Sequence, residues 1–131
     1  MFLASLTYKQ RKVFLGLAKE ILTVDDGVMD NHEEDYLRSL CSEMSLSFND
    51  ELTIEKSEIK NCFDESETKR ILLLELVALG HSNKNYHELQ DNYTDNICNL
   101  INISIDELRK IEDLLKQYND IQNKFIEFIE S

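Results

Sequence analysis

The sequence has no proline and no tryptophan, and only three of its 131 residues are glycine. Proline and glycine supply most of the tight turns in β-hairpins and β-sandwiches, so their scarcity argues against an all-β fold. Three glycines are also too few for the glycine-rich phosphate loops of nucleotide-binding proteins. We therefore expect an all-α protein whose helices are ended by Asn, Asp, Ser and the few glycines.

Basic residues are also few. The 14 Lys and Arg residues stand against 26 Asp and Glu residues, which gives a formal net charge of -12. Binding to nucleic-acid phosphates needs a basic surface, so the charge argues against a nucleic-acid partner. It suits a cation, a basic protein partner, or solubility alone.

Two further features are lacking: a disulfide framework and a membrane segment. The three cysteines are odd in number and never form a C-x-x-C pair, so we expect reduced, buried thiols in a cytoplasmic protein. The N-terminal apolar stretch has no basic lead of a signal peptide. No apolar run reaches the roughly 20 residues that span a bilayer. Peripheral association with a membrane surface stays an alternative.

The longest apolar run is residues 71–79, in which Glu75 is the one polar residue. A helix that is apolar all round has no side to present to water, so the run predicts a buried central helix. A carboxylate within such a helix needs a hydrogen bond, a charge partner or a place at the rim.

Helix starts are marked by a cap residue followed three positions later by Glu or Gln, whose side chain satisfies the cap's own N–H. The pattern occurs at Thr7 to Gln10, Asp30 to Glu33 and Ser104 to Glu107. Together with apolar periodicity it predicts one compact domain, residues 1–131, of about six helices. Two pseudo-repeated antiparallel helical hairpins would surround the central helix, and a long helix over about 105–130 would extend beyond the core.

The pseudo-repeat has a period of 57 residues. Its first set is Tyr36, Leu40, Cys41, Met44 and Leu46, and its second is Tyr93, Ile97, Cys98, Ile101 and Ile103. Both sets follow an apolar helix and a polar turn, as two related hairpins would require.

The end of the long helix carries Phe125, Phe128 and Ile129 beyond the length that the hairpins can cover. This overhang is either a lid packed back on the core or a surface for a partner protein or a second copy. A homodimer through this helix is one alternative.

Six carboxylates crowd residues 25–35 without a basic residue. They are Asp25, Asp26, Asp30, Glu33, Glu34 and Asp35. If Gly27 is the sixth residue of a calcium loop, Asp26, Asp30 and Glu33 fall at ligand positions. Leu22 and Val24 would fall at the first and third positions, where an EF-hand needs ligands. Three interpretations stay open: helix caps and a turn, a weak Ca²⁺ or Mg²⁺ site at Asp25, Asp26, Asp30 and Glu33, or an edge including Glu34 and Asp35 that docks a basic partner.

In the first half of the chain, an apolar helix is followed by residues 24–33, which contain Asp26-Gly27 and Glu33 six residues after the glycine, and then by a helix with Tyr36, Leu37 and Leu40. This half resembles the tellurite-resistance TerB-like family. The second half, residues 73–103, resembles that family's second helical repeat, although its turn at 80–83 has lost the Asp-Gly pair. The resemblance implies a non-enzymatic acidic module linked to stress or tellurite response, the membrane or metal ions. The family's carboxylates would map onto Asp25, Asp26, Asp30 and Glu33.

No catalytic motif is present, and we expect no enzyme. His87-Glu88 lacks the second histidine of a zinc-protease helix, while His81, His87 and Glu88 could share a metal ion or simply be solvated. The alternative function, an acidic inhibitor or immunity-type protein that binds a basic nuclease or toxin, rests on charge and size.

Overall fold

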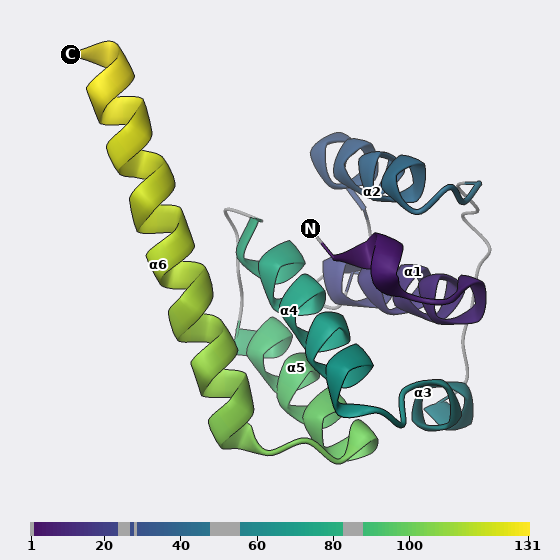
Figure 1. Cartoon of the computed structure of the whole chain (residues 1–131). Coiled ribbons are helices and arrows are strands. Elements are labelled where there is room, and N and C mark those ends of the chain that lie inside the picture. Colours follow the sequence, from purple (N-terminus) through teal and green to yellow (C-terminus); the bar gives the residue numbers. More distant parts are fainter. Residues whose placement is uncertain (1, 24–26, 28, 48–55, 83–87) are drawn as a thin grey trace.

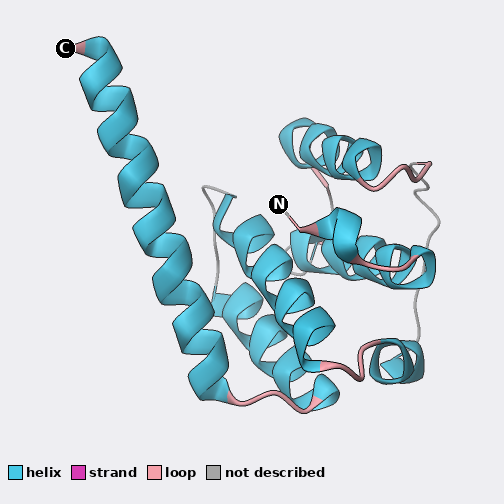
Figure 2. Cartoon of the chain, in the orientation of Figure 1, coloured by secondary structure: helices cyan, strands magenta, loops and turns pink. Residues whose placement is uncertain are grey.

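The computed structural model describes residues 2–23, 27, 29–47, 56–82 and 88–131. All regular structure in these ranges is helical, which confirms the all-α prediction (Figure 2). The elements are a 3-10 turn, η1 (Leu3–Ser5), and the helices α1 (Tyr8–Thr23), α2 (Asn31–Glu43), α3 (Lys56–Cys62), α4 (Ser66–Ser82), α5 (Glu88–Ile101) and α6 (Ile105–Glu130).

Helix α4 is the centre of the domain. It packs against α1, α5 and α6, while α2 and α3 pack against α1 (Figure 1). Leu72, Leu73 and Leu76 on α4 are fully buried, as the apolar run predicts. The expectation that this helix has no exposed side is wrong in one respect. Ile71, Leu74 and Ala78, which share one face of the helix, are only partly buried.

The first two predicted helix caps are present. The Thr7 hydroxyl accepts from the N–H of Gln10 at 3.2 Å, and the Gln10 side chain accepts from the N–H of Thr7 at 2.9 Å. At α2 the carboxylate of Asp30 accepts from the N–H of Glu33 at 2.7 Å, and Glu33 accepts in return from the N–H of Asp30 at 3.1 Å. Local sequence therefore fixes where α1 and α2 begin.

The two halves of the chain share a helix ending. After α2, Ser45 has a φ of 57°, and the N–H of Leu46 donates to the carbonyl of Cys41 at 2.9 Å. The residues with the same roles after α5 are Asn102 (φ 60°), Ile103 and Cys98, with a hydrogen bond of 3.0 Å. Both are Schellman endings, in which a left-handed residue turns the chain out of the helix. Their common geometry, 57 positions apart, supports the pseudo-repeat.

The chain after α5 continues into α6, whose 26 residues make it about 39 Å long at 1.5 Å per residue. Its first half packs on the domain through Leu108, Ile111 and Leu115, which are buried. Its second half extends past the other helices (Figure 1). None of the described helices is long and apolar enough to cross a membrane.

Candidate functional site

The first half of α6 is anchored at its N-terminus. The hydroxyl of Ser104 accepts from the N–H of Glu107 at 3.2 Å, as the capping pattern predicts. The reciprocal half of that pattern differs, because the Glu107 carboxylate instead accepts hydrogen bonds from Arg70 on α4 at 2.6 and 3.1 Å. This ion pair is solvent-exposed and contributes little to stability; it joins the first turn of α6 to α4.

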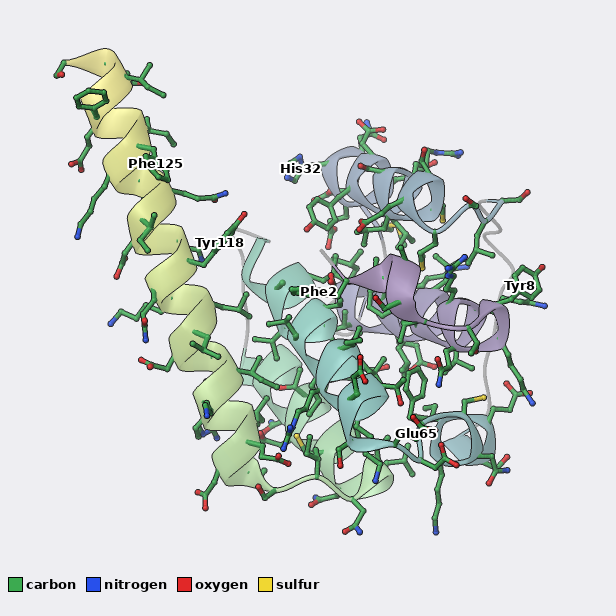
Figure 3. The ribbon with its side chains drawn as sticks, in the orientation of Figure 1. Phe2, Tyr8, His32, Glu65, Tyr118 and Phe125 are labelled. Carbon is green, nitrogen blue, oxygen red and sulfur yellow. The ribbon has the colours of Figure 1, made fainter. Side chains whose placement is uncertain are left out.

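From Leu114 to its C-terminal end, α6 presents an apolar row to solvent. We call this row the α6 stripe: Leu114, Tyr118, Ile121, Phe125 and Phe128, with Ile126 and Ile129 beside it. Successive members are four, three, four and three residues apart, which is the heptad spacing of helices that pair with other helices. Figure 3 shows Tyr118 and Phe125 on the protruding part of α6.

The apolar residues predicted to bind a partner, Phe125, Phe128 and Ile129, lie in this stripe and beside it, whereas Glu34 and Asp35 are on α2. Phe125 is 63% exposed, Phe128 is 80% exposed and Ile129 is 77% exposed. The lid alternative is therefore wrong, because the overhang is not packed back on the core. The apolar end of the chain is a surface.

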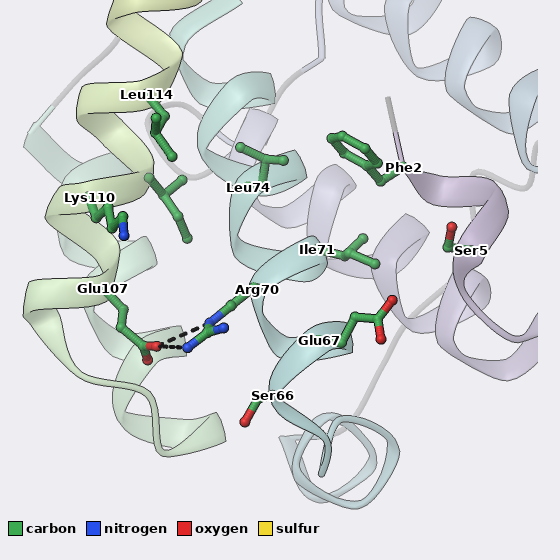
Figure 4. Close-up of a pocket in the computed structure, with 11 residues that line it drawn as sticks. Phe2, Ser5, Ser66, Glu67, Arg70, Ile71, Leu74, Glu107, Lys110 and Leu114 are labelled. Carbon is green, nitrogen blue, oxygen red and sulfur yellow. Dashed lines mark hydrogen bonds and ion pairs between the residues drawn. The ribbon is translucent and has the colours of Figure 1, made fainter.

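A groove of about 800 Å³ lies between α4 and the first half of α6. Its apolar lining is Phe2, Ile71, Leu74, Ile111 and Leu114, and its polar lining is Ser5, Ser66, Glu67, Arg70, Glu107 and Lys110. In Figure 4, Leu114 extends from α6 toward α4, and Phe2 extends toward Leu74 from the opposite wall. We call this feature the α4/α6 groove.

The α4/α6 groove and the α6 stripe are continuous, because Leu114 belongs to both. Among the described residues neither His nor Cys lines the groove, and two of its four charged side chains, Arg70 and Glu107, pair with each other. An apolar floor with charges only at its edges suits the apolar side chains of a helix. Binding is the chemistry that this surface supports best.

The predicted acidic site is described only in part, because Asp25 and Asp26 lie outside the described residues. Asp30 and Glu33 are brought together, but as the reciprocal cap of α2. Glu34 pairs with Arg38 at 2.8 Å, and Asp35 is exposed. Within the described ranges no three His, Cys, Asp or Glu side chains are grouped to hold a metal ion. The ion site therefore stays a prediction, as does a metal at His81, His87 and Glu88, whose side chains are not described.

The described groups whose pKa is raised by burial are Tyr93, Cys41 and Cys98, and none of them lines the groove. Tyr93 on α5 donates from its hydroxyl to Glu20 on α1 at 2.6 Å, and burial, followed by the Glu20 carboxylate, raises the pKa of Tyr93 far above its ordinary value. Burial also raises the pKa of Cys41, and it raises the pKa of Cys98 to about 11. Both thiols are protonated at neutral pH and are poor nucleophiles.

Sequence reasoning missed the groove. None of its eleven lining residues, among them Phe2, Leu74 and Leu114, was singled out for binding. One signal was available for the stripe: Leu114, Ile121 and Phe128 stand seven residues apart. The walls of the groove come from three separate segments, so no local pattern predicts them.

Comparison with models of known protein families, with curated proteins and with solved structures finds no match to this chain. The resemblance to the TerB-like family stays a prediction from residues 24–40 and 73–103. The surface itself must carry the argument about function.

Proposed function

We propose that this chain is a non-catalytic protein-interaction module that binds another protein through the α6 stripe and the α4/α6 groove. One observation carries the proposal: seven large apolar side chains between Leu114 and Ile129 of one helix are 45% to 80% exposed. Contiguous apolar surface of this kind on a folded domain marks an interaction site. Single exposed apolar residues are ordinary, but a row in heptad register is not.

The size of the surface is consistent with a stable complex. Aromatic and large aliphatic side chains exposed to this degree present roughly 700 Å². Burying that area is worth about 17 kcal/mol at about 25 cal/mol per Å². Association costs about 4 to 15 kcal/mol in lost freedom, so a favourable remainder is left.

The charge of α6 favours a protein over a membrane surface. The helix has seven carboxylates against four basic side chains. Helices that lie on anionic membranes carry Lys and Arg on their polar face, because the cytoplasmic leaflet is negative. We expect vesicles rich in phosphatidylserine to leave the chain in solution.

Two predictions from the sequence stand beside this proposal. The acidic turn at 25–35 as a site for a cation or basic partner, in the manner of TerB-like proteins, rests on its carboxylates. The acidic inhibitor of a nuclease or toxin rests on net charge. No contact among the described residues favours the second of these.

Photo-crosslinking tests the proposal. Benzoylphenylalanine is placed at Phe125, or at Lys116 as a control, because Lys116 is exposed on the side of α6 opposite the stripe. In the cells that naturally produce the protein, we expect a discrete adduct from Phe125 and none from Lys116. Equal labelling at both positions, or no adduct at either, would refute the assignment of the stripe as a binding surface.

A further inference from the structure

We propose that the protein bound by the α6 stripe is a second copy of this chain, and that the two α6 helices pair antiparallel so that each overhang lies along the other copy's α4/α6 groove. This inference names the partner and rests on the proposed function. Four observations support it: the register of the stripe, the position of the groove, the area available and the distribution of charge.

The register of the stripe is complementary to itself when the helix is reversed. The core positions of a heptad are called a and d. In an antiparallel pair, an a residue of one helix meets a d residue of the other. Tyr118 then meets Ile121 of the second copy, Leu114 meets Phe125, and Ile111 meets Phe128. The same three contacts recur on the other side of the two-fold axis, which passes between Tyr118 and Ile121. One pairing therefore covers every member of the stripe.

The groove lies where the second overhang would go. The protruding half of α6 has no described part of its own domain beside it (Figure 1). On α4, Ile71 and Leu74 are partly buried and line the groove next to the first half of α6 (Figure 4). Antiparallel pairing places Phe125 of the second copy level with Leu114, at the groove. A parallel pairing would place Leu114 opposite Leu114 of the second copy and leave both grooves without an overhang.

The area fits a two-fold dimer. The stripe presents roughly 700 Å² per copy, and stable interfaces bury about 800 Å² per partner. The partly exposed groove residues Phe2, Ile71 and Leu74 supply further apolar surface. A two-fold interface uses the same patch on both copies, which is what a self-complementary stripe provides.

Charge along the helix favours the antiparallel arrangement. Lys110 lines the groove and comes level with Glu127 and Glu130 of the second copy. Antiparallel helices also place opposite ends of their dipoles together. The net charge of -12 on each copy opposes association over longer range, so added salt strengthens the dimer. Binding of a basic protein would instead weaken with salt.

The first test is the mass of the full chain in solution from about 1 µM to about 200 µM, by sedimentation equilibrium. We expect the dimer mass at the upper end, with tighter association in higher salt. Phe125→Asp places a charge in the interface and should weaken association at least about tenfold. Its matched control is Asn123→Asp, which makes the same charge change on the opposite side of α6 and should leave the dimer intact.

A disulfide test determines orientation. The Tyr118→Cys and Ile121→Cys proteins are made in a Cys62→Ser background. Each is oxidised alone, and a mixture of the two reduced proteins is oxidised in parallel. Antiparallel pairing predicts cross-linked dimers in the mixture and few in either protein alone. Cross-links within each single protein would indicate parallel helices and would refute the arrangement.

The outcomes separate this inference from the function on which it rests. If the chain stays monomeric at about 200 µM while Phe125 captures a different protein in cells, the self-association is wrong and the interaction module stands. If Phe125→Asp dimerises as tightly as the unaltered chain, the stripe is not the dimer interface. If Phe125 captures nothing and the chain is monomeric, both proposals fail.

Discussion

The side-chain carboxylate of Glu75 accepts a hydrogen bond of 2.7 Å from the backbone N–H of Phe2. Glu75 is the one polar residue of the central apolar run and is 5% exposed. A carboxylate buried to this degree needs a hydrogen-bonding partner. The bond joins α4 to the segment before η1. It also positions Phe2, whose ring forms one wall of the α4/α6 groove (Figure 4).

Replacing Glu75 tests this link. Glu75→Leu leaves the N–H of Phe2 without its acceptor and should lower the free energy of unfolding by about 1 to 3 kcal/mol. Glu75→Gln keeps an acceptor oxygen and should cost less. Urea unfolding measures both, and faster hydrogen exchange at residues 2–6 in the leucine variant alone would locate the loss. Equal stability of the two variants would contradict the role given to the bond.

The acidic turn makes a prediction about metal ions. If it holds Ca²⁺ or Mg²⁺, the thermal midpoint should rise by several degrees over the value in chelator, since a ligand at a hundred times its dissociation constant adds about 2.7 kcal/mol. Asp26→Asn combined with Glu33→Gln should abolish the rise. The introduced glutamine would still satisfy the α2 capping pattern, so the baseline stability is largely kept. No shift with Ca²⁺, Mg²⁺, Mn²⁺ or Zn²⁺ would exclude the site.

Alkaline pH should destabilise the fold through two buried acids. Burial raises the pKa of Cys98 from 9.0 to about 11, and burial together with Glu20 raises the pKa of Tyr93. Both groups hold their proton more tightly in the folded chain than in the unfolded chain. Their contribution to the free energy of unfolding is therefore full below pH 9 and is lost as pH rises through 9 to 11 and beyond. Unfolding in urea across this range should show the decline.

A pair of cysteine variants separates this effect from general alkaline repulsion. Cys98→Ala should flatten the decline between pH 9 and about 11, because the buried thiol is gone. Cys62→Ala, at a half-buried position, is the matched control and should leave the slope as it is. The same slope in both variants would show that Cys98 is not responsible.

Truncation of two phenylalanines should change the free energy of unfolding by very different amounts. Phe14 is fully buried in the core, so Phe14→Ala should cost about 3 to 5 kcal/mol. Phe125 lies outside the core, so Phe125→Ala should change the stability of the monomer by less than about 0.5 kcal/mol. Unfolding at submicromolar concentration makes the comparison. A large loss from Phe125→Ala under those conditions would place the residue within the fold.

Sequence predicted those parts of the structure that local chemistry decides. The caps of α1 and α2 follow from residues three apart, and the burial of Leu72, Leu73 and Leu76 follows from an apolar run. It did not predict which side of α4 stays open, because that depends on where α6 lies. Glu107 illustrates the limit: its spacing from Ser104 predicts a reciprocal cap, but Arg70, 37 positions away, takes its carboxylate.

The matched helix endings at Cys41 and Cys98 divide the chain into two units of three helices, α1 to α3 and α4 to α6. Such a chain is what tandem duplication of an ancestral gene segment would leave. The first two helices of each unit are similar in length, whereas the third has 7 residues in α3 and 26 in α6. The two units therefore differ most in their third helix. The surface proposed for partner recognition lies on that helix.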